Sequence, residues 1–156
     1  MTDAFLKRHL TWLITVLTLV SAAGCGPQRP AATYRVSGKV VFADGTPLAT
    51  GGTILLESVD GQPAYNARGA IQDDGTFRLS TFDEGDGAVA GKHRVIVIAK
   101  RDAADWVERG IVPRPVIDPR FEDYETSALG FTVEPDGNDE FTVTVERPTA
   151  TSATVQ

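Results

Sequence analysis

Hydrophobic and polar residues alternate in short runs along most of this chain, and turn residues separate the runs. In residues 34–42, Val36 and Val40 fall on one face while Ser37 and Lys39 fall on the other. An alternation of period two is typical of a β-strand with one buried face. The pattern therefore predicts a strand over residues 34–42.

Six further runs predict strands, and most are bounded by Gly, Pro or Asp. Residues 65–80 read as a hairpin, because the turn Asp73-Asp74-Gly75 lies between two short runs. Residues 93–99 are apolar on both faces, which predicts a strand covered on both sides. The six runs are residues 52–58, 65–71, 76–80, 93–99, 129–133 and 140–145.

Residues 101–128 interrupt this rhythm. Asp102 to Arg109 predicts one or two helical turns around Trp106, and the prolines that follow keep the chain extended. Seven short strands without alternating helices predict an all-β fold, an antiparallel β-sandwich.

The N-terminus has the layout of a secretory signal peptide. Lys7 and Arg8 precede an uncharged, mostly apolar run over residues 10–23, which is too short to span a bilayer comfortably. The run leads into Ser21-Ala22-Ala23-Gly24-Cys25. Small residues directly before a cysteine resemble the lipobox of bacterial lipoproteins. A plain secretory signal, an uncleaved anchor and a buried free cysteine are the alternatives.

The lipobox resemblance implies that the Cys25 thiol receives a diacylglyceryl group and that cleavage follows Gly24. Two or three acyl chains hold a protein at a membrane almost permanently, whereas one chain binds only marginally. Gly26, in place of an acidic residue, favours the outer membrane. The predicted organisation is a signal peptide at 1–24, a lipidated terminus and spacer at 25–33, a sandwich domain at 34–147 and a disordered tail at 148–156.

Charge and cysteine content narrow the possible partners. The chain has 156 residues, with 15 Lys and Arg against 21 Asp and Glu, and a net charge of -6. Removal of residues 1–24 would leave a charge of -7. An acidic chain without a basic stripe argues against nucleic-acid binding and against attraction to anionic lipid headgroups. One cysteine can form neither an intrachain disulfide nor a cysteine-rich zinc site.

Several turn and strand motifs, in this order and spacing, resemble the transthyretin-like, carboxypeptidase-regulatory-like modules. That resemblance implies a seven-stranded Greek-key sandwich. A second set of segments is similar to uncharacterised planctomycete lipoproteins built on this module, for which no function is established. The first set is Val36-Ser37-Gly38-Lys39-Val40, Asp44-Gly45-Thr46-Pro47-Leu48, Asp74-Gly75-Thr76-Phe77 and Gly91-Lys92-His93-Arg94-Val95; the second is Gly85-Asp86-Gly87-Ala88 and residues 119–129.

Candidate catalytic chemistry is sparse. His93 is the single histidine after the signal peptide, and we interpret it as a strand residue more readily than as a base or metal ligand. A hydrolase would require His93 beside Ser80 or Ser127 and an orienting acid, and no nucleophile-elbow motif is present. We therefore expect no enzyme activity, no metal and no cofactor.

Two other groups could bind ligands. Asp83, Glu84 and Asp86 offer oxygen atoms suited to calcium, but they lack the spacing of a calcium loop. Trp106, Phe121 and Tyr124 could form a stacking platform for a sugar or a peptide, or could instead plug one end of the sandwich.

The sequence thus predicts a lipid-anchored, non-enzymatic module of the cell envelope, facing the periplasm or the exterior, that acts as a structural or protein-interaction domain. The alternative is a carbohydrate-binding module that uses the three aromatic residues.

Overall fold

The computed structural model describes residues 29–60, 63–101, 114–135 and 139–149. The chain divides into two compact units, Met1–Pro30 and Ala31–Gln156. Only Arg29 and Pro30 of the first unit are described, so the predicted signal peptide and Cys25 lie outside the described residues, as do Trp106 and the expected helical turns around it.

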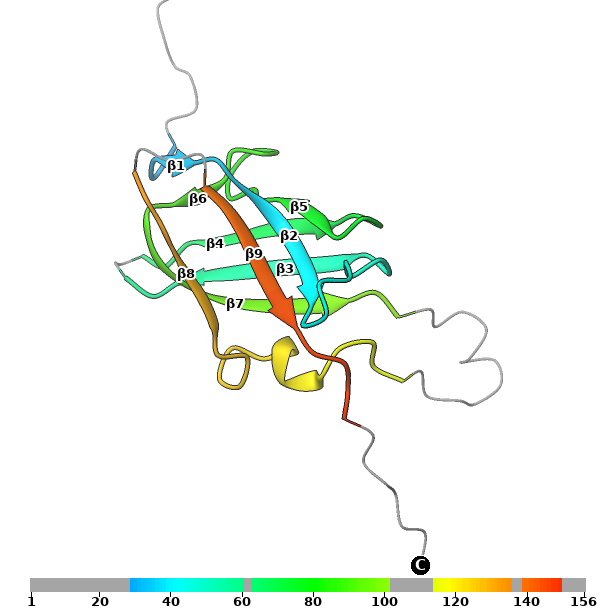
Figure 1. Ribbon diagram of the computed structural model, residues 1–156. Coiled ribbons are helices and arrows are strands. Elements are labelled where there is room, and N and C mark those ends of the chain that lie inside the picture. Colours follow the sequence, from blue (N-terminus) through cyan, green and yellow to red (C-terminus); the bar gives the residue numbers. More distant parts are fainter. Residues whose placement is uncertain (1–28, 61–62, 102–113, 136–138, 150–156) are drawn as a thin grey trace, which may run out of the picture. The chain divides into compact units, whose positions relative to one another are not determined.

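The second unit is all-β, as the alternation predicts. Its seven-stranded sheet has the order β8-β7-β3-β4-β5-β2-β9 (Figure 1). A short pair, β1 (Thr33–Tyr34) with β6 (Ala88–Val89), lies outside this sheet. The sheet strands are β2 (Val36–Phe42), β3 (Gly52–Ser58), β4 (Asn66–Ile71), β5 (Thr76–Arg78), β7 (Gly91–Ala99), β8 (Leu129–Val133) and β9 (Asp139–Val145).

The expectation of a purely antiparallel sheet is wrong at one pair of strands. Strand β9 runs parallel to β2, in a register from Val36 opposite Asp139 to Phe42 opposite Val145. The other pairs of the sheet are antiparallel. Alternation has the same period in either direction, so the hydrophobic pattern cannot distinguish the two kinds of pairing.

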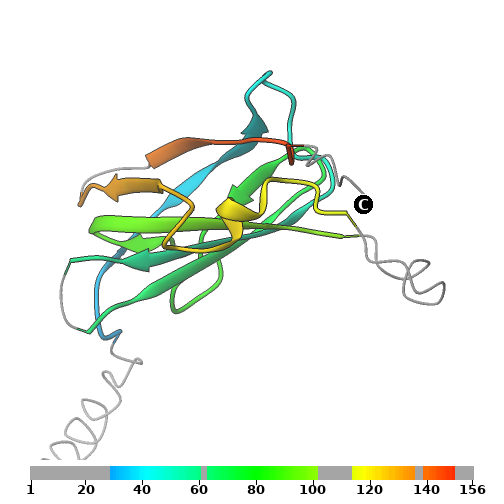
Figure 2. The same cartoon turned by 90° about the horizontal axis from the view of Figure 1, so that it is seen from below.

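The sheet curls until its two edge strands, β8 and β9, approach each other (Figures 1 and 2). Phe131 on β8 and Phe141 on β9 stack with ring centroids 3.9 Å apart and planes inclined by 13°. No backbone ladder joins the two strands in the described residues. Aromatic packing therefore closes this seam of the curled sheet where backbone hydrogen bonds do not.

The segment 116–128, which directly precedes β8, continues the closure between β7 and β9. The Asp118 amide donates to the Glu146 carbonyl at 2.8 Å, next to β9, and the Ser127 hydroxyl donates to the Val95 carbonyl of β7 at 2.7 Å. Ile117 and Phe121 enter the core from this segment. A short 3-10 helix, Pro119–Glu122, places Phe121.

The core fills the inside of the curled sheet with side chains from every second strand position. Val36, Val40, Ile54 and Leu56 are fully buried there, together with Val95 and Val97 of β7, as their alternation predicts. The outer face of β7 is only partly covered, because Ile96 is buried whereas Ile98 is 41% exposed. The prediction that both faces of this strand are buried is therefore confirmed at Ile96 and wrong at Ile98.

Gly38 lies where neighbouring strands leave no room for a side chain. A Cβ atom at Gly38 would lie 2.0 Å from the Phe141 carbonyl oxygen and 2.7 Å from the Phe77 ring. Gly45 has a different reason to be glycine, since its φ is +82° in a turn with open space around it. One glycine is required by packing and the other by backbone conformation.

Candidate functional site

His93 lies on the inner face of β7 and is 3% exposed. Its Nε2 atom is 2.9 Å from the Val89 carbonyl oxygen, whereas its Nδ1 atom is buried without a hydrogen-bond partner. The ring also faces Phe131, with centroids 6.4 Å apart. The imidazole is thus a buried group of the core, as its place in an apolar run predicts. Almost none of its surface is exposed to solvent.

The two serines considered as nucleophiles have other partners. The Ser127 hydroxyl is buried and donates to the Val95 carbonyl. The Ser80 hydroxyl accepts a hydrogen bond from the Gly85 amide at 2.8 Å. Neither hydroxyl is hydrogen-bonded to His93, whose described polar contact is with Val89. The structure therefore does not assemble a nucleophile and base from these residues.

The three aromatic residues considered as a platform do not share one surface. Phe121 is 3% exposed and belongs to the core, and the Arg120 guanidinium lies 4.6 Å from its ring centroid. Tyr124 is half-buried beneath Arg94, at 5.4 Å from the guanidinium carbon. Trp106 lies outside the described residues. Phe121 therefore packs into the fold, which is the second of the two roles that the sequence analysis considered for it.

Arg94 organises the polar surface beside Tyr124. Its guanidinium pairs with Glu57 at 2.5 Å and with Glu125 at 2.6 Å, and these two hydrogen bonds raise its pKa. Burial, and then the negative charge of Glu57, raise the pKa of the Tyr124 hydroxyl. The ion pair with Glu125 therefore ties the segment 116–128 to β7.

The acidic loop 83–86 is held by one of its own carboxylates. Asp86 accepts hydrogen bonds from the backbone amides of Thr81, Phe82 and Asp83 at 2.7 to 3.1 Å, and the Thr33 hydroxyl lies 3.5 Å away. Both carboxylate oxygens are thereby directed into the loop. In the described ranges, no three His, Cys, Asp or Glu side chains gather to hold a metal ion.

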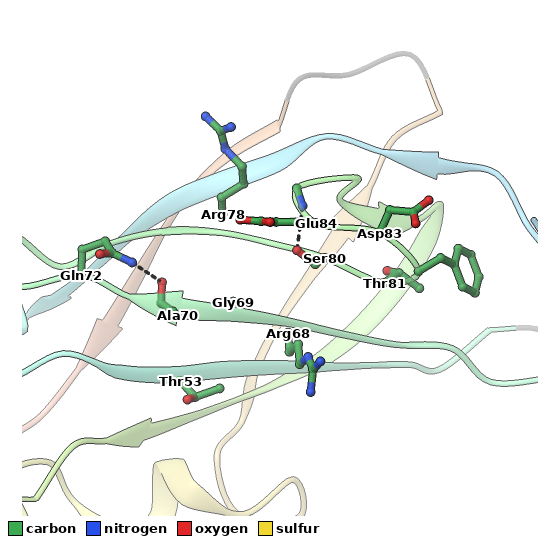
Figure 3. A pocket seen from close by; sticks show the side chains of 12 residues that line it. Thr53, Arg68, Gly69, Ala70, Gln72, Arg78, Ser80, Thr81, Asp83 and Glu84 are labelled. Carbon is green, nitrogen blue, oxygen red and sulfur yellow. Dashed lines mark hydrogen bonds between the residues drawn. The ribbon is translucent and has the colours of Figure 1, made fainter.

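A polar groove of about 880 Å³ lies on the outer face of β3, β4 and β5, with the loop 81–85 as one wall. Figure 3 shows Arg68, Arg78 and Gln72 around the small residues Gly69 and Ala70. The strand register brings these residues together, because Arg68 lies opposite Ser80 across the hairpin. The remaining lining residues are Thr53, Ser80, Thr81, Phe82, Asp83, Glu84 and Gly85.

Sequence reasoning missed this groove, although part of its signal was present. The predicted hairpin over residues 65–80 places Arg68 and Arg78 on the polar face of neighbouring strands. Each arginine alone resembles an ordinary solvated strand residue. The fold of the loop 81–87 over that face depends on the hydrogen bonds of Asp86, which alternation does not encode.

Cys25 and the signal segment cannot be placed, because they lie outside the described residues. Among the residues that are described, we find no helix with the length and apolar character needed to cross a bilayer.

No protein-family model matches the chain, and comparison with curated proteins gives no match either. Among solved structures, a 9R-lipoxygenase from Cyanothece PCC8801 is similar to it with 15% identity and a TM-score of 0.38. The alignment covers 85% of this chain and 20% of the lipoxygenase, so the chain spans about a fifth of that enzyme's length. A likeness this weak supports no inference about activity.

Proposed function

We propose that this chain is a lipid-anchored, non-enzymatic module of a bacterial cell envelope that acts by contact with an envelope protein or glycan. The observation that carries the proposal is the cysteine placed directly after an apolar run and the small residues 21–24. Residues 26–32 separate Cys25 from the first strand at Thr33. A spacer of this length keeps the β domain close to the membrane that the acyl chains enter.

The proposed fold family is that of the transthyretin-like modules, with a Greek-key sandwich. Seven sheet strands and a curled sheet support this assignment. The two layers of such a sandwich would correspond to opposite sides of the curl.

A role by contact is supported by how the polar side chains are used. His93 packs in the core, Ser127 holds a loop, and Asp86 holds the acidic loop. A glycan platform built from Trp106, Phe121 and Tyr124 is the weaker alternative, since Phe121 is buried.

The anchor is tested by comparing the wild-type chain with Cys25→Ala in the bacterial host. Wild-type protein should partition into the detergent phase, and mass spectrometry should find acyl chains on Cys25. The Cys25→Ala variant should stay in the aqueous phase or remain uncleaved. Ser21→Ala keeps a small residue before the cysteine and serves as the matched control. Equal partitioning of wild type and Cys25→Ala would show that Cys25 is not the anchor.

A further inference from the structure

Two arginines on the groove lack the carboxylate partners that four other described arginines have. Arg94, Arg101, Arg120 and Arg147 each form an ion pair with a carboxylate. In the described part of the chain, the guanidinium groups of Arg68 and Arg78 have neither a hydrogen bond nor an ion pair, and the Arg68 hydrogen bonds to Ser80 are those of its backbone. The chain carries a net charge of -6, so carboxylates are not in short supply. These two guanidinium groups are therefore available to an external anion.

The two guanidinium groups are separate binding points. Arg68 and Arg78 are diagonal neighbours on adjacent antiparallel strands. Backbone geometry places the Cα atoms of such neighbours about 7–8 Å apart. Figure 3 shows their side chains pointing away from each other. The stem of Arg78 packs against Gly85, where an added Cβ would lie 3.2 Å from Cδ. With the side chains directed apart in this way, one small anion does not contact both guanidinium groups, so the matching ligand carries several anionic groups along a chain.

The rest of the lining adds groups that bind hydroxyl-rich molecules. Thr53 and Gln72 can donate and accept hydrogen bonds, whereas the Thr81 hydroxyl, which donates to the Gly87 carbonyl at 2.7 Å, can only accept. Glu84 likewise can only accept hydrogen bonds when ionised. Glu84 is exposed on the rim and has no hydrogen bond within the described residues. A ligand that satisfies this lining must bring hydrogen-bond donors to Glu84 as well as anionic groups to the arginines.

From this combination we infer that the groove binds an acidic polysaccharide, a chain of sugars that bear carboxylates. Its carboxylates would pair with Arg68 and Arg78, because the planar guanidinium matches a carboxylate with two parallel hydrogen bonds. Its hydroxyl groups would donate to Glu84 and exchange hydrogen bonds with the neutral lining residues. Polyphosphate brings no hydroxyl donors for Glu84, and a neutral glycan leaves both arginines without a counter-charge.

The loop that forms the wall is fixed before a ligand arrives. Asp86 ties three consecutive amides of this loop, which removes much of the ordering cost that binding would otherwise include. The inference does not depend on lipidation, since the groove lies on the β domain and the anchor on the preceding segment. A groove that binds no acidic sugar can therefore be distinguished from a chain that carries no lipid anchor.

The test is calorimetric titration of oligogalacturonate into the full chain, purified in detergent, at low and at moderate salt. We expect saturable binding that weakens as salt rises. Arg68→Gln and Arg78→Gln should each weaken binding about tenfold or more, because each removes a charge-assisted pair. Arg114→Gln removes one exposed arginine outside the groove and should leave the affinity unchanged.

Three ligand controls decide the chemical class. Methyl-esterified oligogalacturonate keeps the sugar and loses the charge, so equal binding of the ester would overturn the role of the arginines. Poly-glutamate or polyphosphate binding as tightly as oligogalacturonate would overturn the assignment to a sugar chain. No binding of any acidic sugar by wild type would overturn the inference altogether. Unchanged thermal melting of the variants shows that lost binding does not reflect lost folding.

Discussion

Phe131 and Phe141 stack face to face, 3.9 Å apart, across the seam between the two edge strands of the sheet. The strands β8 and β9 share no backbone ladder in the described residues, and this pair of rings connects them. A small hollow of about 110 Å³ lies beside the pair. The seam therefore depends on side-chain packing where other neighbouring strands depend on hydrogen bonds.

Removing either ring should open the seam. Both rings are half-buried, so Phe131→Ala and Phe141→Ala should each lower the free energy of unfolding by about 1–3 kcal/mol, less than the roughly 3–5 kcal/mol of a fully buried phenylalanine. A double-mutant cycle in chemical denaturation should give a coupling of about 0.5–1.5 kcal/mol. Thr142→Ala, exposed on the same strand, should change stability by less than about 0.5 kcal/mol. Additive losses would mean that the stack contributes nothing of its own.

The turn at Asp44 should make folding sensitive to acid. Hydrogen bonds from the Thr46 hydroxyl at 2.5 Å and the Thr46 amide at 2.9 Å, with help from Arg147, lower the pKa of Asp44 to about 2. A carboxyl whose pKa is lower in the folded state stabilises the fold above its unfolded pKa of 3.8. That contribution is lost as the pH falls from 3.8 toward 2.

NMR titration of the Asp44 carboxyl checks this prediction. Thr46→Val should raise the pKa of Asp44 further than Arg147→Gln does, because the Thr46 hydrogen bonds are the larger cause. Asp44→Asn should flatten the fall in stability between pH 4 and 2. A pKa of Asp44 near 3.8 in the wild-type protein would contradict the hydrogen-bond geometry of this turn.

The core position of His93 predicts that its volume matters more than its polarity. His93→Ala should cost about 2–4 kcal/mol of unfolding free energy through a cavity. His93→Leu fills most of that space and removes the unpartnered Nδ1, which offsets the lost hydrogen bond to Val89, so it should cost no more than about 1 kcal/mol. Thermal and denaturant unfolding measure both. Equal losses of unfolding free energy in His93→Leu and His93→Ala would indicate that the polar contact of His93 matters more than its volume.

The two glycines should respond differently to alanine. Gly38→Ala places a Cβ against the Phe141 carbonyl and should cost more than about 3 kcal/mol, because backbone cannot move aside cheaply. Gly45→Ala meets only open space and should cost about 1–2 kcal/mol from its left-handed backbone. Denaturant midpoints of the two variants give the comparison, and a milder effect at Gly38 would show that β2 and β9 can separate locally.

Alternation and turn residues predict the seven strands and the all-β class, because each strand shows its buried face within a few residues. The parallel pairing of β9 escapes that reasoning, since period two carries no direction. Phe121 shows another limit. An aromatic residue in an irregular segment can face either way; here the segment is bound beside β9 by the hydrogen bond from Asp118 to Glu146, and Phe121 faces inward.

The candidate site was less accessible to sequence reasoning than the fold. The hairpin register shows that Arg68 and Arg78 share a face, but only the folded loop turns that face into a groove. The prediction for Cys25 is of the opposite kind, because it rests entirely on the position of this residue in a linear sequence motif.

The pairing of β9 with β2 also sets an order on folding. Residues 36–42 keep one edge unpaired until residues 139–145 arrive, although the intervening strands could pair earlier. Contacts so distant in sequence form slowly, and an open strand edge invites pairing with other chains. A chain that loses residues 139–145 should therefore aggregate through β2, and a growing chain can complete this domain only after nearly all of it has been synthesised.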